Sequence, residues 1–130
     1  MEKIVIYQVF TRLFGNNKTS CVHNGSIEEN GVGKMADFTL KALEQIKSLG
    51  ATHIWYTGLI EHATQTDYGR YGIRKDHPEV VKGRAGSPYA IKDYYDVDPD
   101  IATKVPERIK EWEALIERTH KAGMKVIQDF

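Results

Sequence analysis

The chain has 130 residues, of which 41% are hydrophobic and 28% are charged, and its 18 basic side chains equal its 18 acidic ones. This length suits one domain or part of a larger one, and the charge balance excludes a net field that would attract nucleic acid or an anionic membrane. No apolar run reaches membrane-spanning length, the N-terminus has no signal-peptide pattern, and one cysteine permits no internal disulfide. We therefore expect a soluble, cytoplasmic protein with no nucleic-acid or membrane partner.

The first 57 residues predict a strand, a polar loop, a helix and a second strand. Residues 3–10 form a short run rich in β-branched and aromatic residues, which is typical of a buried strand. After a loop rich in glycine and asparagine, residues 37–49 predict a helix with Asp37 as its N-cap and Gly50 after its end. The apolar, β-branched stretch 52–57 predicts the second strand.

The remaining residues predict a long loop, a second helix and a third strand. Residues 58–104 lack sustained periodicity, so we expect a long loop. A helix over 106–122 follows, with Pro106 in its first turn and Gly123 after its end, and residues 125–130 predict the third strand. Crossover helices between short strands indicate parallel pairing. Because three strands and two helices leave sheet edges unprotected, we expect the first part of a longer fold.

The segment from Tyr89 to Pro99 has an unusual composition, with three tyrosines and three aspartates in eleven residues. It shows the apolar period of neither a helix nor a strand. Tyrosine offers a flat apolar face with a hydroxyl, and aspartate accepts hydrogen bonds. Because sugars present apolar ring faces edged with hydroxyls, this composition suits a carbohydrate-binding loop. The alternative is a structural loop that covers the core.

Four segments, in this order, resemble the N-terminal part of the α-amylase family of glycoside hydrolases. Residues 6–10 resemble its first barrel strand, and residues 43–55 resemble its passage into the second. Residues 89–99 resemble a tyrosine-containing segment of the family, and residues 122–129 resemble its first conserved region on strand three. The resemblance implies an α/β fold: a partial TIM (β/α)₈ barrel, with strands one to three, two crossover helices and the long loop after strand two.

The resemblance also implies roles for two residues. A tyrosine at the position of Tyr89 stacks on the sugar ring beside the bond that is cleaved, so Tyr89 is the expected substrate-binding residue. Ser87 and Pro88 replace the usual His-Gly or Asn-Gly before it, which removes a histidine contact to the sugar. Asp129 matches an aspartate that supports the active site without being the nucleophile. The alternative for Tyr89 is that its ring only packs within the loop.

The reaction implied is hydrolysis of α-glucosidic bonds in starch-like glucans or oligosaccharides by a retaining double displacement. That mechanism needs two carboxylates about 5 Å apart. In the family they follow later barrel strands, so we name no catalytic residue and expect these 130 residues alone to be inactive. We expect Glu61, after the second strand, to order the long loop. No cofactor is expected.

Other site motifs are incomplete. A calcium-loop pattern has Ile101 where the sharp turn needs glycine, so we expect a solvated acidic turn and no metal. Residues 31–34 lack the strand and the hydroxyl residue of a phosphate loop. The basic and aromatic stretch 62–88 is mixed with acidic residues and predicts a solvated groove wall. The acidic residues of the calcium-loop pattern are Asp96, Asp98, Asp100 and Glu107.

Two other functions remain open. One is a non-catalytic α/β fragment that binds sugar weakly or self-associates through its open sheet edges. The other is a nucleotide-binding α/β domain, which is weaker because no glycine-rich turn follows the first strand.

Overall fold

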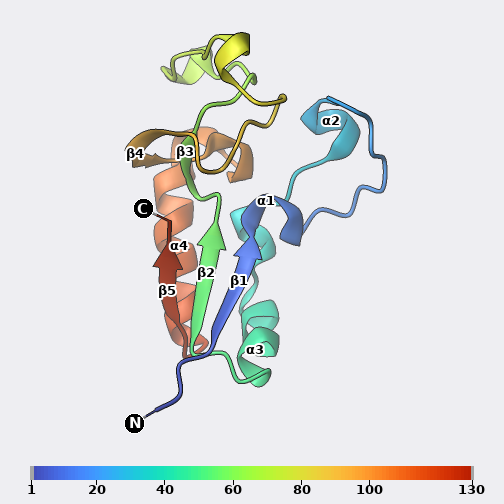
Figure 1. Cartoon of the computed structure of the whole chain (residues 1–130). Coiled ribbons are helices and arrows are strands. Elements are labelled where there is room, and N and C mark those ends of the chain that lie inside the picture. Colours follow the sequence, from blue (N-terminus) through green and yellow to red (C-terminus); the bar gives the residue numbers. More distant parts are fainter. Residues whose placement is uncertain (1, 130) are drawn as a thin grey trace.

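A sheet of three parallel strands forms the centre of the molecule in a computed structural model that describes residues 2–129 (Figure 1). The strands are β1 (Ile6–Phe10), β2 (His53–Thr57) and β5 (Lys125–Gln128), in the order β1-β2-β5. Ile6 pairs with His53, which pairs with Lys125. The carboxyl ends of all three strands therefore lie at one edge of the sheet. The α/β fold with a parallel sheet is confirmed; Phe130, the last residue of the predicted third strand, lies outside the described residues.

Two helices connect the strands and lie on one face of the sheet (Figure 1). Helix α3 (Leu40–Ser48) runs between β1 and β2, and α4 (Arg108–Lys121) runs between β4 and β5. Their apolar sides meet the sheet in a core that includes Phe38, Tyr56 and Trp112, whose rings make successive edge-to-face contacts. The Tyr56 hydroxyl shares a 2.7 Å hydrogen bond with Thr119 on α4, which satisfies both buried groups.

The predicted start of the first helix was wrong. Thr39, not Asp37, is the N-cap of α3, and its hydroxyl accepts a hydrogen bond from the Ala42 N–H at 3.1 Å. Asp37 instead ends the 3₁₀ turn η1 (Met35–Asp37), where its carboxylate accepts from the Lys34 N–H at 2.7 Å. Both side chains are good caps, so the sequence pattern does not decide between them.

The second helix also begins later than predicted. Pro106 lies in the 3₁₀ turn η5 (Val105–Glu107), and the α-helix begins at Arg108. Proline suits this place because it lacks an N–H that a helix start would leave unpaired.

The region after β2 contains a second, two-stranded sheet that the sequence did not predict. β3 (Ile60–His62) pairs antiparallel with β4 (Ile91–Val97), so the prediction that the Tyr89–Pro99 segment has no strand was wrong. The register shifts on both sides of Glu61. A strand interrupted in this way does not present the regular two-residue alternation that marks a strand in a sequence.

Short turns occupy the rest of the connections. The loop after β1 contains α1 (Thr11–Phe14) and α2 (Ile27–Asn30), and the region between β3 and α4 contains η2 (Gly69–Tyr71), η3 (Pro78–Val80) and η4 (Pro99–Ile101). Among residues 2–129, no helix combines the length and the apolar character that a membrane crossing requires.

Candidate functional site

The loops that follow β1 and β2 rise above the carboxyl ends of the strands (Figure 1). In α/β folds with parallel strands, functional side chains gather at that end of the sheet. The loop after β1 covers residues 11–39, and the region after β2 carries the β3–β4 sheet and the turns between its strands. Both predicted site residues, Tyr89 and Asp129, lie in segments that follow a strand towards this end.

Tyr89 lies in a tight turn and leaves most of its side chain open. The Ala90 N–H donates to the Ser87 carbonyl at 3.0 Å, and the Tyr89 N–H donates to the Ser87 hydroxyl at 3.3 Å. Tyr89 is 63% exposed, so its ring face is available to a ligand. Its role in binding sugar stays a prediction.

The turn that carries Tyr89 is fixed on one side to β3 and on the other to Ala63, the residue after β3. After it, the Ala63 N–H donates to the Ala90 carbonyl at 3.0 Å. Before it, the Ala85 carbonyl is 2.9 Å from Nε2 of His62, a fully buried residue of β3. An exposed aromatic ring on a turn held at both ends is suited to binding, because little conformational entropy is lost when a ligand contacts it.

Asp129 follows β5 and is held by a neighbouring strand. Its Oδ1 accepts a hydrogen bond from Trp55 Nε1 on β2 at 3.0 Å. Its Oδ2 is buried and has no hydrogen-bond partner among residues 2–129. The side chain is therefore oriented by Trp55 and keeps one acceptor free. Within the described residues, no hydrogen bond joins Asp129 to the turn that carries Tyr89.

The expectation of a solvated acidic turn near residue 98 was wrong, because Asp98 and Asp100 are both buried. Asp100 accepts a hydrogen bond from the Tyr68 hydroxyl, and its Oδ2 lies 3.4 Å from Arg12 Nη1. Lys34 Nζ donates to the Asp100 carbonyl at 2.5 Å. These contacts join the loop after β1 to the region after β2.

Burial changes the titration of this group of side chains. Burial, followed by the charge of Asp100, raises the pKa of the Tyr68 hydroxyl, which favours the neutral donor form. Burial lowers the pKa of Lys34, although the nearby Asp100 opposes that effect.

The four acidic residues of the calcium-loop pattern are not brought together: Asp96 pairs with Arg108, and Glu107 pairs with Lys110.

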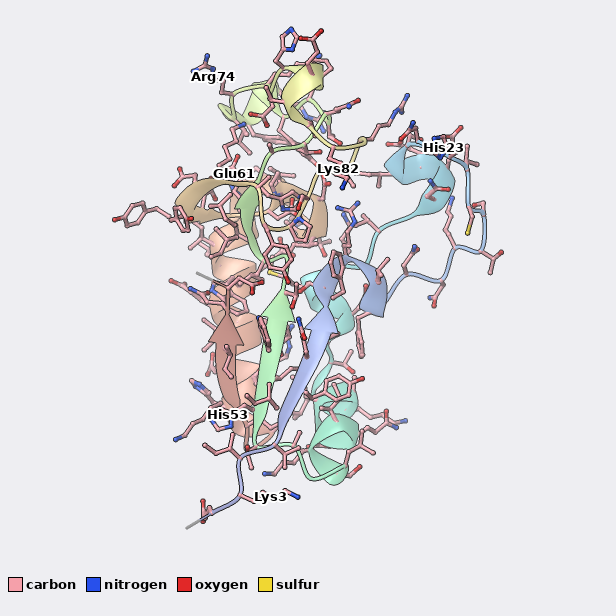
Figure 2. The ribbon with its side chains drawn as sticks, viewed as in Figure 1. Lys3, His23, His53, Glu61, Arg74 and Lys82 are labelled. Atoms are coloured by element: carbon pink, nitrogen blue, oxygen red, sulfur yellow. The ribbon has the colours of Figure 1, made fainter. Side chains whose placement is uncertain are left out.

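A second acidic cluster lies where β3 pairs with β4. Carboxylate oxygens of Glu61, Asp93 and Asp96 lie within 4.8 Å of one another (Figure 2 labels Glu61). Burial raises the pKa of the Glu61 carboxyl, and the charge of Asp96 raises it further. Lys92 lies 3.7 Å from Glu61, and Arg108 binds Asp96 through two contacts of 2.6 and 2.7 Å. Lys92 and Arg108 therefore offset part of the negative charge of these three carboxylates.

Glu61 is thus one of the residues that order the long connection, as its position suggested. The cluster itself was missed because it depends on the β3–β4 pairing. Aspartates at positions 93 and 96 gave no metal-ligand spacing with position 61 in the sequence.

A hollow of about 1030 Å³ lies between the loop after β1 and the turns after β3. Figure 2 shows the side chains of this region, with His23 and Lys82 marking the two loops. Polar side chains dominate its lining, and Ala85 at its edge lies four residues before Tyr89. Sequence reasoning identified residues 62–88 as a groove wall but did not identify the loop after β1 as the opposite wall. Representative lining residues are Arg12, Asn16, Gln65, Thr66, Arg84 and Asp100.

Comparisons with known proteins find close likeness in structure and none among curated sequences. A family model described as "Alpha amylase, catalytic domain" matches residues 8–130. No curated protein matches the chain. Among solved structures, trehalose-6-phosphate hydrolase from Bacillus licheniformis is 29% identical with a TM-score of 0.59, and the match covers 98% of this chain and 17% of that one.

Two further solved structures are similar to the same extent. A maltogenic α-amylase from Thermotoga neapolitana is 26% identical with a TM-score of 0.60, over 98% of this chain and 22% of that one. The α-amylase from Geobacillus thermoleovorans, complexed with acarbose, is 26% identical with a TM-score of 0.61, over 99% of this chain and 24% of that one.

The chain therefore spans between about a sixth and a quarter of the length of these solved relatives. Its parallel sheet and helices match the partial TIM-barrel region of their catalytic domains, as the sequence predicted. With the family match extending over residues 8–130, the chain belongs to the α-amylase family of glycoside hydrolases.

Proposed function

We propose that the protein hydrolyses α-glucosidic bonds in starch-like glucans or oligosaccharides by a retaining double displacement. Residues 1–130 supply barrel strands one to three and one wall of the sugar site. The observation that carries this proposal is the Tyr89 turn, which holds a 63% exposed ring on a fixed backbone four residues after Ala85, a residue that lines the hollow. An aromatic face beside many polar groups is the surface that a sugar ring with its hydroxyls requires.

Family membership supports the chemistry that we propose. A retaining glycosidase uses one carboxylate as nucleophile and a second as acid and base, about 5 Å apart. The close carboxylates of residues 2–129, Glu61, Asp93 and Asp96, lie beside Lys92 and Arg108. Asp96 is held by Arg108 in a two-contact ion pair, and Glu61 lies 3.7 Å from Lys92, so we assign these two carboxylates to the packing of the β3–β4 sheet. We therefore assign the chemical step to later barrel strands, and assign substrate binding and support of the site to Tyr89 and Asp129.

Two of the solved relatives support the substrate class that we propose. The Thermotoga enzyme is a maltogenic α-amylase, and the Geobacillus enzyme was solved with acarbose. An α-linked glucose polymer or oligosaccharide is therefore the substrate we propose.

The experiment is hydrolysis of soluble starch and maltoheptaose by the protein at its natural length. We expect turnover with α-configured product, detected by proton NMR immediately after mixing. Tyr89→Ala is expected to lower kcat/KM at least about tenfold, the loss of a stacking contact of roughly 1.4 kcal/mol. Tyr89→Phe keeps the ring and is expected to stay close to the wild type.

Tyr95→Ala is the matched control, because Tyr95 is 95% exposed and lies on the same stretch of chain. Absence of hydrolysis, β-configured product, or an equal effect of Tyr89→Ala and Tyr95→Ala would contradict the proposal. The 130-residue chain tested alone is expected to show no turnover.

A second proposal concerns residues 1–130 in isolation. In the described residues, β1 and β5 are the outer strands of the sheet, and Ile6 on β1 is 50% exposed. Unpaired strand edges beside apolar side chains favour association between chains. We expect the isolated chain to form oligomers in light scattering as its concentration rises; a monomer at all concentrations would contradict this second proposal.

A further inference from the structure

Two buried polar atoms face each other without a hydrogen bond above the sheet. Nδ1 of His62 on β3 lies 3.8 Å from Oδ2 of Asp98, which follows β4. His62 is 2% exposed and Asp98 is fully buried. Neither atom has a hydrogen-bond partner in the part of the chain that the structure describes. Buried polar atoms are nearly always paired, so this pair requires an explanation.

The other polar atoms of both side chains are already used. Nε2 of His62 lies 2.9 Å from the Ala85 carbonyl. Because a carbonyl can only accept, Nε2 must carry a hydrogen. Oδ1 of Asp98 accepts from the Asp100 N–H at 3.0 Å. The atoms left over, Nδ1 and Oδ2, can therefore be satisfied by each other alone.

At 3.8 Å the two atoms are within ion-pair distance but too far apart for a hydrogen bond, so an approach of about 1 Å would let one proton between Nδ1 and Oδ2 satisfy both atoms. It can belong to a neutral Asp98 that donates to a neutral imidazole, or to an imidazolium that donates to an ionised Asp98. The two forms contain the same number of protons, and both keep the hydrogen on Nε2. Without this proton, a carboxylate and a nitrogen lone pair would face each other away from water, which is costly. Two hydrogen bonds of about 2.8 Å at the near-tetrahedral angle of a water span about 4.6 Å, so a water would fit between atoms 3.8 Å apart only with a narrowed angle.

The surrounding charges favour keeping the proton in the pair. Burial raises the pKa of the Asp98 carboxyl well above its usual value, and the charge of Asp100 raises it further. Arg12 and Lys34 oppose this effect, but both make their hydrogen bonds to Asp100. The Tyr68 hydroxyl also donates to Asp100. His62 and Asp98 are therefore left to pair with each other.

The segment that His62 holds leads directly to Tyr89. Gly86, next to Ala85, has a φ of +71°, and a Cβ added there would lie 1.8 Å from the Ala63 carbonyl oxygen and 3.3 Å from Cδ2 of His62. The backbone of residues 85 and 86 is thus pressed against β3 beside the His62 ring. The only side chain of β3 that hydrogen-bonds this backbone among the described residues is His62.

We propose that His62 is a positioning residue, and that a proton shared between His62 and Asp98 keeps its Nε2–H on the Ala85 carbonyl and so fixes the Tyr89 ring at the substrate site. The role of the ring in sugar binding rests on the proposed function. The hydrogen-bond arrangement does not, and can be measured without any substrate.

The first test is ¹⁵N NMR of the histidine side chains of the natural-length protein. We expect Nε2 of His62 to carry a hydrogen and Nδ1 to have the ¹⁵N chemical shift of a protonated or hydrogen-bonded nitrogen. A bare Nδ1 with no hydrogen-bond shift would contradict the shared proton. A neutral ring with its hydrogen on Nδ1 and a bare Nε2 would overturn the proposal. This result stands whether or not the protein hydrolyses glucans, so it separates a failure of the proposed His62–Asp98 pairing from a failure of the proposed function.

The second test uses paired variants in maltoheptaose hydrolysis. At position 98, Asp98→Leu removes the partner of His62 Nδ1, whereas Asp98→Asn keeps a hydrogen-bond donor for it. At position 62, the side chain in His62→Asn is too short to hydrogen-bond the Ala85 carbonyl, whereas His62→Gln keeps an N–H at the position of Nε2. We expect kcat/KM to fall about tenfold in Asp98→Leu and His62→Asn and to be rescued at least threefold by the conservative partner of each. The same losses are expected to disappear in a Tyr89→Ala background, because the ring being positioned is gone.

Equal activity of each pair, or losses that persist unchanged in the Tyr89→Ala background, would show that the pair only stabilises the fold. Thermal melts accompany every variant. Where a leucine variant does not fold, the wild-type tautomer decides the proposal.

Discussion

Gly86→Ala tests how tightly the backbone before Tyr89 is packed against β3. Gly86 has a φ of +71°, so any other residue there pays for a left-handed conformation, about 1–2 kcal/mol. The new Cβ would also lie 1.8 Å from the Ala63 carbonyl oxygen, far inside contact distance, and this neighbour is backbone that cannot rotate away. Overpacking of this kind adds about 1–3 kcal/mol. We expect a total loss of about 2–5 kcal/mol in the free energy of unfolding.

Gly72→Ala provides the matched control for this prediction. Gly72 has a φ of +78°, but nothing lies within 4 Å of a Cβ added there, so only the conformational cost remains. In urea unfolding with an unchanged slope, Gly86→Ala is expected to lose about 1–3 kcal/mol more than Gly72→Ala. Hydrolysis should fall with the first and not with the second. Equal losses of stability would refute the packing that we describe between residues 86 and 63.

Three further predictions concern the buried charges. Tyr68→Phe leaves Asp100 without its hydroxyl donor and should lower the free energy of unfolding in urea by about 1–3 kcal/mol. Tyr71→Phe should lower it little, because the Tyr71 hydroxyl donates to no described residue. Equal losses in the two variants would contradict this prediction. Arg108→Gln and Asp96→Asn should each cost roughly 2 kcal/mol and show a coupling of about 1–3 kcal/mol in a double-mutant cycle, while additive costs would contradict the two-contact pair. The pKa of Glu61 is raised in the folded state, so its protonated form contributes stability that is present below the unfolded pKa and is lost as pH rises through the folded pKa. Relative to the wild type, Glu61→Gln should therefore gain stability as the pH rises above the unfolded pKa of about 4.5, and a pH-independent difference would count against this assignment.

The regular elements could be predicted from the sequence because each one carries its own local signal. The helices have apolar faces of the right period, and the three parallel strands are short runs of β-branched and aromatic residues. The helix starts were less predictable, because Asp37 and Thr39 are both competent caps and tertiary packing decides between them.

The β3–β4 sheet could not be predicted, because its pairing shifts register on both sides of Glu61 and its longer strand is only partly buried. The buried state of Asp98 and Asp100 could not be predicted either. Their partners come from far along the chain, with Arg12 lying 88 residues from Asp100. The run of acidic residues near position 98 therefore predicted a solvated turn, whereas in the structure Asp98 and Asp100 are buried and hydrogen-bonded.

The two candidate site residues were identified by resemblance to a family and not by any periodicity. The composition around Tyr89 suggested sugar binding, but only the fold shows that its turn is fixed at both ends. Asp129 carries no local signal beyond its position after a strand. Its orientation by Trp55 depends on the pairing of β2 with β5.

The measurement that tests the central claim most directly is a crystal structure of the natural-length protein with a bound α-glucan oligosaccharide. The account predicts a glucose ring stacked on the Tyr89 side chain, with the turn from Ser87 to Ala90 in the conformation described above and further sugar units in the polar hollow. An oligosaccharide bound at the active site with Tyr89 facing solvent would contradict it.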